Sequence, residues 1–316
     1  MRWRIKNPAP TDGRREKWGD FHFGESLADA LRELGQEVET DYHPEWDVDA
    51  PCDVVLVLRG KYPYCFDGRY GNPILLMWNI SHPGDVDEDE YGRYDRVFVA
   101  SGQRARELAP ALDGRVEALL QCTDTRRFHT GADFDASFRR GVIFVGNTRS
   151  QRRELVVRLG EAGVPLEVWG RGWRDHGLAH RVVEEYIDNR ALGDLYRRAR
   201  VCINDHWTDM IEHGFINNRL FDALACGLPV LSDVHPAIAE TLSDDAVLQA
   251  PPDRAVRALG KMLLRYPSHL QAAQRVSEQI RAEHGFDARA RPLVDAARSF
   301  TNGSAAEPIA PINQRG

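Results

Sequence analysis

GFINNRLFDALACGLPVLSD, residues 214–233, joins a polar start with two Asn and an Arg to a helical pattern and then a short apolar run. The apolar spacing of residues 219–227 predicts a helix whose buried face packs on a sheet. A Gly-Leu-Pro break ends that helix, and the apolar run of 229–233 predicts a short buried strand directly after it. A helix that leads into a buried strand is typical of parallel sheets whose two faces are covered by helices.

The same alternation of strands and helices occurs along the whole chain. In the second half, strands are predicted over 141–146, 166–170, 201–205 and 229–233, and helices over 152–163, 191–199 and 219–227. In the first half, strands are predicted over 54–59, 74–78, 96–100 and 116–121, and a helix over 23–35. These runs are short, apolar and bounded by turn residues, as expected for strands that are buried on both faces.

Two successive sets of this kind predict an α/β protein with two doubly wound, Rossmann-like domains that face each other across a cleft. The N-terminal domain is expected over 1–130 and the C-terminal domain over 141–285, with the connection near 129–140. A helix over 286–300 is expected to cross back onto the N-terminal domain, and 301–316 is expected to be a flexible tail. Ligands of such folds bind at the carboxyl ends of the strands, so the cleft is the predicted site.

Composition indicates a globular protein of two domains. The chain has 316 residues, of which 42% are hydrophobic, enough to form a sizeable core. Its five cysteines are scattered without a C-x-x-C pair, which favours reduced thiols and a cytoplasmic location. The opening residues lack the apolar segment of a signal peptide, and no apolar run is long enough to predict a membrane span. Peripheral contact with a membrane remains open.

The charge of the chain is uneven. Residues 1–130 hold 17 Lys and Arg against 24 Asp and Glu, a net charge of −7, whereas residues 131–316 hold 24 of each kind. A net negative charge argues against nucleic acid or anionic lipid as a partner of the first half. Local patches of positive charge are not excluded by this sum.

The start of the helix at 219–227 is a candidate anion site. Asn217, Asn218 and Arg219 fall in its first turn, where free N–H groups and the helix dipole attract negative charge. Arg219 adds a guanidinium that matches phosphate oxygens. Asp222 follows one turn later, where its carboxylate could accept hydrogen bonds from a ribose diol. The alternative is an ordinary helix capped by Asn, with a surface Asp.

A second candidate follows the strand at 141–146. The sequence FVGNTRSQRREL, 144–155, has a glycine turn and residues of the cap type before the next helix: Asn147, Thr148 and Ser150. Three cations crowd the same helix start: Arg149, Arg152 and Arg153. They oppose the helix dipole unless an anion lies between them, and the alternative is a solvated basic turn balanced by nearby carboxylates. Two such sites at strand ends of one domain favour a bound phosphate.

Four segments together resemble the two-domain GT-B glycosyltransferases of group 1, or family 4, and in particular their spore-maturation-protein-like branch. FDALACGLPVLSD resembles the E-A-x-A-C-G-x-P-V block of that class, with Asp222 where the class usually has Glu. QCTDTRRF (121–128), VGNTRSQRREL and WNISHPGDV (78–86) resemble its segments at the domain linker, the donor phosphate and the N-terminal histidine loop. The resemblance spans about residues 20–300.

The resemblance implies a role for each matching position. It implies that the N-terminal domain holds the acceptor and that the C-terminal domain holds the nucleotide-sugar donor. Asp222 would contact the donor ribose, Arg149 and Arg153 would neutralise the diphosphate, and His82 would face the donor sugar. The backbone of four residues would contact sugar and phosphate: Phe215, Ile216, Asn217 and Asn218. The alternative for His82 is a plain turn residue at a strand end.

One position departs from the family pattern. The class has two acids eight residues apart, and counting back from Asp222 gives Gly214. Either Glu212, two residues further off, takes that role, or the role is absent.

Three further groups of residues are weaker candidates. The segment KWGDFHFGE (17–25) is expected on the acceptor side, with Gly19 in its loop and Asp20 and His22 as candidate bases, or as part of a helix cap. Gly170 permits a tight loop that presents Trp173, which either lines a nucleobase or sugar pocket or fills the core as a plug. Tyr186 lies in the segment that meets the base in the resembled class.

The function expected from these residues is transfer of a sugar from a nucleotide-diphosphate-sugar donor to an acceptor: a glycan, a lipid-linked sugar, a protein or a small molecule. The resemblance implies a retaining reaction. Neither metal nor cofactor is expected, because the acidic run DVDEDE (85–90) is typical of a solvated surface. The alternatives are an epimerase or hydrolase of the same fold, which would use several cleft acids, and a non-catalytic module that binds sugar nucleotides. The oligomeric state is left open.

Overall fold

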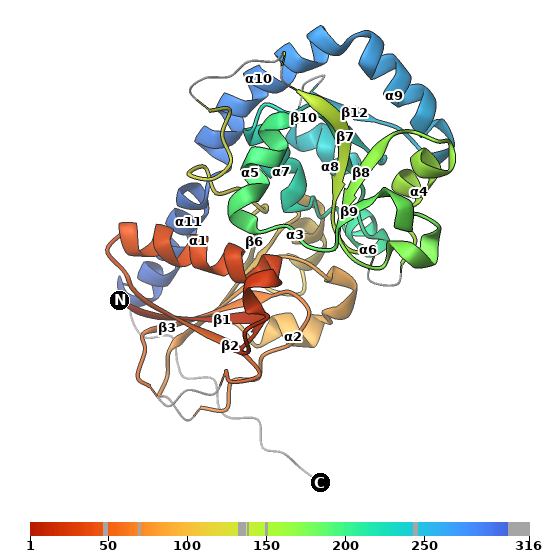
Figure 1. Cartoon of the computed structure of the whole chain (residues 1–316). Helices are drawn as coiled ribbons and strands as arrows, with labels where there is room; N and C mark the ends of the chain where they lie inside the picture. The colour runs from red at the N-terminus through yellow and green to blue at the C-terminus, as the bar shows by residue number, and fades with distance from the viewer. Residues whose placement is uncertain are drawn as a thin grey trace.

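The computed structural model describes residues 1–46, 50–68, 71–131, 137, 139–148, 151–242 and 246–302. It contains two parallel sheets of six strands each, one built from each half of the chain, with helices packed on both (Figure 1). The predicted class, α/β with two doubly wound domains, is therefore confirmed.

The N-terminal sheet has the strand order β2-β1-β3-β4-β5-β6. Its strands are β1 (Arg2–Pro10), β2 (Glu37–His43), β3 (Val54–Arg59), β4 (Ile74–Asn79), β5 (Arg96–Val99) and β6 (Val116–Ala118). The helices of this half are α1 (Gly19–Glu33), α2 (Glu88–Gly92) and α3 (Gly102–Leu108). The strand order reverses between β1 and β3, which places a topological switch point at the carboxyl ends of these two strands.

The C-terminal sheet has the order β12-β11-β10-β7-β8-β9. Its strands are β7 (Arg140–Val145), β8 (Leu166–Trp169), β9 (Val182–Glu184), β10 (Ala199–Asn204), β11 (Val230–Ser232) and β12 (Val247–Gln249). The helices are α4 (Glu154–Glu161), α5 (Asn189–Arg198), α6 (Thr208–Glu212), α7 (Asn218–Ala225), α8 (Pro236–Thr241), α9 (Ala255–Leu264) and α10 (Tyr266–Glu283). Here the switch point lies between β7 and β10.

The last helix, α11 (Phe286–Asn302), packs on the N-terminal half of the molecule. Its Phe286 and Leu293 share a hydrophobic cluster with Phe23 and Leu27 of α1. Burying these side chains fixes the end of the described chain to the domain in which the chain starts. Among the described helices, none is both long and apolar enough to cross a bilayer.

Helix α6 connects the two halves on another side. Met210 and Phe215 belong by sequence to the second half, yet both are buried in the same cluster as Val57 and Met77 of the N-terminal sheet. The hydroxyl of Ser101, the cap of α3, donates a hydrogen bond to the carbonyl of His213 over 2.6 Å. The segment after β10 therefore contacts the N-terminal half as well as the C-terminal half to which it belongs.

Candidate active site

A cavity of about 1320 Å³ lies between the two domains. From the N-terminal half it is lined by Asp20 and His82, and from the C-terminal half by Asn147, Trp207 and Glu212, among others. A cavity of this size is large enough to hold more than one small molecule.

A smaller cavity of about 220 Å³ adjoins it at the switch point of the C-terminal sheet. The residues after β7 (Gly146 and Asn147), the residue after β10 (Asp205) and the start of α7 (Asn218 and Arg219) meet there. Both predicted anion sites of the C-terminal domain therefore open into the same small cavity, and His82 and Asp20 close it from the other domain.

The start of α7 has the geometry of a capped helix. Asn217 is the N-cap, and its side-chain oxygen accepts a hydrogen bond from the N–H of Leu220 over 3.3 Å. The side chain of Asn218 is exposed in the next position. The ordinary cap that was the alternative is therefore present, and the same residues line the small cavity. A capped helix start and an anion site are compatible, because one cap satisfies only part of the free N–H groups.

Arg219 is fixed by the strand ends beneath it. Its Nε donates to the carbonyl of Val145 over 2.6 Å, and its Nη1 donates to Oδ1 of Asn204 over 3.1 Å. The guanidinium lies over the ring of Phe144, 4.6 Å from its centroid. A cation that is already oriented in this way loses little conformational entropy when it binds an anion.

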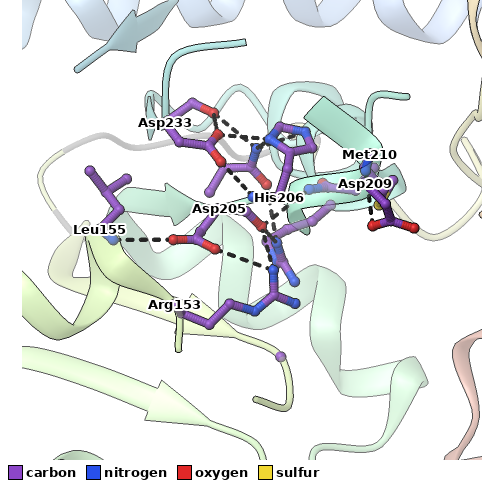
Figure 2. A network of polar contacts seen from close by, with 12 residues as sticks. Arg153, Leu155, Asp205, His206, Asp209, Met210 and Asp233 are labelled. Atoms are coloured by element: carbon purple, nitrogen blue, oxygen red, sulfur yellow. Dashed lines mark hydrogen bonds and ion pairs between the residues drawn. The ribbon is translucent and has the colours of Figure 1, made fainter. Parts of the chain in front are cut away.

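Arg153 lies at the wall of the small cavity in a buried ion pair (Figure 2). Its Nη1 donates to Oδ1 of Asp205 over 3.2 Å, and its guanidinium lies 3.2 Å from the ring centroid of Trp207. The other carboxylate oxygen of Asp205 accepts a hydrogen bond from the N–H of Leu155 at the start of α4. Burial raises the pKa of Asp205 to about 6, against the opposing effect of Arg153.

A histidine–aspartate pair supports the next residues of the same loop (Figure 2). Nδ1 of His206 lies 2.7 Å from Oδ1 of Asp233, and the backbone N–H of His206 donates to Oδ2 of Asp233 over 2.6 Å. Burial alone would raise the pKa of Asp233, but the adjacent His206 lowers it overall. This pair joins the ends of β10 and β11, and so fixes the loop that carries Asp205 and Trp207.

The basic turn before α4 divides into two parts. Arg152 is paired with Glu154 and Glu161 on the surface, as the alternative of a balanced basic turn predicted. Arg153 faces the small cavity. Arg149 and Ser150 lie outside the described residues, so their predicted places at the phosphate stay predictions.

His82 is both a turn residue and a cavity residue. Its backbone is left-handed, with φ at 53°, and its Nδ1 lies 2.9 Å from the hydroxyl oxygen of Ser81. The 3-10 turn that follows, Pro83–Asp85, contacts α6 of the other domain. His82 lines both cavities, and its contact with a donor sugar stays a prediction.

On the acceptor side, Gly19 and Asp20 line both cavities, and His22 lines neither. Nε2 of His22 lies 2.7 Å from the carbonyl oxygen of Glu16, and burial lowers the pKa of the imidazole. Because the ring is turned to the preceding loop, the geometry does not support His22 as an acceptor-side base, and that role stays a prediction.

Trp173 and Gly170 do not reach the cavities. The indole of Trp173 is 1% exposed, its Nε1 donates to the carbonyl of Gly146 over 3.0 Å, and its ring meets Phe144 edge to face. Of the two predicted uses of this tryptophan, the core plug is the one observed. A Cβ on Gly170, whose φ is 143°, would lie 2.2 Å from the carbonyl oxygen of Gly146. The absence of a side chain at Gly170 therefore lets the loop after β8 approach the loop after β7 closely.

Four further predicted residues occupy different places. Phe215 and Ile216 have buried side chains and line neither cavity. Tyr186 lines the large cavity, and its hydroxyl donates to the carbonyl of Glu16 over 3.2 Å, across the domain boundary. Glu212 is exposed at the edge of the large cavity.

Asp222 is buried behind the small cavity and lines neither cavity. Its Oδ1 accepts a hydrogen bond from the hydroxyl of Thr123, in the linker between the domains, over 2.7 Å. Its Oδ2 accepts a hydrogen bond over 3.4 Å from Nδ2 of Asn218, which lines the small cavity. Contact of Asp222 with a donor ribose stays a prediction. Burial raises the pKa of Asp222 to about 7, although the Thr123 hydrogen bond opposes the rise.

The raised pKa predicts that Asp222→Asn stabilises the protein above neutral pH. Since the folded pKa of about 7 exceeds the ordinary value of 3.8, the contribution of Asp222 to stability is most favourable below pH 3.8 and falls as the pH rises between these two values. At pH 8 the neutral variant should be more stable by roughly 2–4 kcal/mol, and near pH 4 this difference should vanish. Denaturant unfolding at both pH values measures the effect; an equal difference at both would contradict the assigned pKa.

Several cavity residues were missed by the sequence predictions. Asp205 ends the predicted strand at 201–205, so a carboxylate at a strand end was the available signal. Trp207 carried no signal, because an isolated tryptophan is as common in a core as in a site. His43 and Tyr62 were also missed; both line the large cavity.

Comparison with known proteins supports the fold and names a family for part of the chain. Residues 149–295 match a family model described as "Glycosyl transferase-like". Sucrose-phosphate synthase from Thermosynechococcus elongatus superposes with a TM-score of 0.67 at 16% identity, over 96% of this chain and 100% of that one. AviGT4, a glycosyltransferase involved in avilamycin A biosynthesis, gives 0.64 at 17%, over 96% and 99%. No curated protein matches the chain.

A third similar structure contains ligands. The Anabaena protein HepE in complex with UDP and glucose gives a TM-score of 0.64 at 10% identity, over 95% of this chain and 100% of that one. The fold is thus the two-domain GT-B fold of these structures, and residues 149–295 match the glycosyl transferase-like family model. Placement in family 4 and in the spore-maturation-like branch stays a prediction.

Proposed function

We propose that the protein is a glycosyltransferase that moves a sugar from a nucleotide-diphosphate-sugar donor to an acceptor held by the N-terminal domain. The observation that carries the proposal is the meeting of the two predicted anion sites in one small cavity, opposite His82. The glycosyl transferase-like match over 149–295 covers this donor side, and HepE, of the same fold, was solved with UDP and glucose.

The proposed chemistry is electrostatic. As the bond between sugar and phosphate breaks, negative charge grows on the nucleoside diphosphate that leaves. Arg153, Arg219 and the N–H groups at the start of α7 surround the small cavity and would stabilise that charge without moving. His82 would contact the sugar, and Asp20, on the other side, would accept the proton of the acceptor hydroxyl.

Retention of configuration and independence from metal are part of the proposal and are open to direct test. Within the described part of the chain, His, Cys, Asp and Glu side chains form no group of three that could hold a metal ion. Activity in the presence of EDTA tests metal independence. The anomeric configuration of the product, read by NMR, tests retention.

The first experiment is binding and turnover with the full chain. A thermal-shift screen against nucleoside diphosphates and nucleotide sugars should give at least one stabilising nucleotide, because a ligand that binds only the folded state raises Tm. Donor consumption should then require an added acceptor.

The alternatives give different results in the same experiment. A hydrolase would consume the donor in water alone, an epimerase would return an isomer of the donor, and a binding module would bind it without turnover. Any of these three results would overturn the transferase proposal. Absence of all nucleotide binding would overturn the site as well.

A further inference from the structure

The N-terminal wall of the large cavity contains an aromatic and basic group of residues that the proposed chemistry does not use. We call Pro8, Pro10, His43, Lys61 and Tyr62 the platform; all five line the large cavity, and none lines the small one. They come from the carboxyl ends of β1 and β2 and from the residues after β3. These three strands are neighbours in the sheet, so their ends converge at its switch point.

The platform is built around a pair of stacked rings. His43 and Tyr62 lie parallel, with centroids 4.0 Å apart and planes inclined by 7°. Trp46 meets His43 edge to face from the core side and is held there by a hydrogen bond from its Nε1 to the carbonyl of Asn7. Together with the two proline rings, this forms a preorganised apolar surface, of the kind against which the C–H groups of a sugar ring can pack.

The platform also carries a cation. Nζ of Lys61 lies 5.1 Å from the ring centroid of Tyr62, and within the described ranges no carboxylate pairs with it. Lys17, on the same cavity, likewise lies over the ring of Tyr186 instead of a described acid. These lysines belong to a half of the chain whose net charge is −7. Burial and the nearby Lys61 lower the pKa of His43, which favours the neutral form of that ring.

The platform lies next to the proposed point of transfer. A Cβ on Gly60 would lie 3.3 Å from the Pro8 ring, 3.4 Å from the Ser81 hydroxyl and 3.8 Å from Oδ1 of Asp20. Gly60 thus allows the end of β3 to approach Pro8, Ser81 and Asp20 closely. A ring on the platform would therefore present a hydroxyl towards Asp20, and beyond it towards the small cavity.

From this arrangement we infer that the acceptor is a carbohydrate with an anionic substituent, a phosphate or a carboxylate, whose ring packs on His43 and Tyr62 and whose charge is bound by Lys61. The inference rests on the proposed function, since it assigns the acceptor class of the same cleft. A neutral sugar would gain the ring contact alone. An anionic sugar would add a charge-assisted contact in a cavity that is partly shielded from water.

The test uses the full chain and three matched sugars: glucose, glucose 6-phosphate and glucuronic acid. Binding is followed by ligand-observed NMR at low ionic strength. At least one anionic sugar should bind about tenfold more tightly than glucose, as expected for one charge-assisted contact. Comparison of the phosphate with the carboxylate identifies the preferred anion. Lys61→Met should remove the preference, and Lys261→Met, which removes an exposed lysine on α9, should retain it.

Two results would overturn the inference: glucose binding as tightly as both anionic sugars, or a preference that survives in Lys61→Met. Absence of binding by both anionic sugars would overturn it too. A parallel titration with the nucleotide found in the thermal-shift screen separates this inference from the proposed function. If the nucleotide binds the wild-type protein and the anionic preference is missing, only the acceptor class is wrong; if no nucleotide binds, the proposed function fails first.

Discussion

Replacement of Arg153 by methionine is expected to weaken nucleotide binding by about 10- to 100-fold, which is the effect of losing one charge-assisted contact to a diphosphate. The same change leaves Asp205 buried without its cation, since the two side chains are 4% and 6% exposed. Loss of one partner of a buried pair typically destabilises a protein by about 3–5 kcal/mol. The single variant therefore reports binding and stability together.

The double variant Arg153→Met/Asp205→Asn separates these two effects. With both charges removed, most of the lost stability should return, because no buried charge is left uncompensated. Nucleotide affinity should stay low, because the cation at the small cavity is still missing. Arg158→Met is the matched control: this exposed arginine of α4 pairs with Glu161 on the surface and lines neither cavity, so stability and affinity should change little. Calorimetric titration and denaturant unfolding measure both quantities, and a double variant with wild-type nucleotide affinity would show that Arg153 has only a structural role.

Asp41→Asn is expected to cause the largest loss of stability in the N-terminal domain, about 3–5 kcal/mol. The Asp41 carboxylate is shared by two buried cations of β1: Nε of Arg4 donates to it over 2.9 Å, and Nζ of Lys6 donates to it over 2.8 Å. Lys6 is 1% exposed; its Nζ also donates to the carbonyl of Trp46 and lies over the ring of Tyr64. Removing the carboxylate charge leaves buried Lys6 without an acidic partner and Arg4 with only the exposed Glu39.

Glu39→Gln is the control for that prediction. Glu39 also pairs with Arg4, over 2.6 Å, but its side chain is 73% exposed, so its removal should change stability by less than about 1 kcal/mol. Urea unfolding of the two variants at pH 7 provides the comparison. If Asp41→Asn lost no more unfolding free energy than Glu39→Gln, groups other than Asp41 would have to stabilise the buried cations.

The same ion pairs explain why part of the fold could not be predicted from the sequence. The strands at 54–59, 74–78 and 141–146 were predicted because they are continuous apolar runs, as buried parallel strands usually are. β1 (Arg2–Pro10) lies between β2 and β3, yet its sequence RWRIKNPAP alternates charged and apolar residues and gives no such signal. Its charges are acceptable inside only because Asp41 lies opposite on β2, and a pairing between distant residues is not visible in a local pattern.

Some residues of the candidate site could likewise be predicted from the sequence, and others could not. Asn147, Asn218 and Arg219 were predicted from helix starts that follow strands, and the structure brings them to one cavity, because the carboxyl ends of parallel strands share one edge of the sheet. For Trp173 the sequence left two uses open, a pocket wall or a core plug, and only the packing on Phe144 shows that it is a plug. His43 and Tyr62 are 19 residues apart in sequence, and only the sheet order stacks them.

A crystal structure of the full chain with a bound nucleoside diphosphate tests the central claim most directly. The account predicts phosphate oxygens in the small cavity, within hydrogen-bond distance of Arg153 or Arg219 and of backbone N–H groups at the start of α7. Phosphates that lie elsewhere, with that cavity filled only by water, would contradict it.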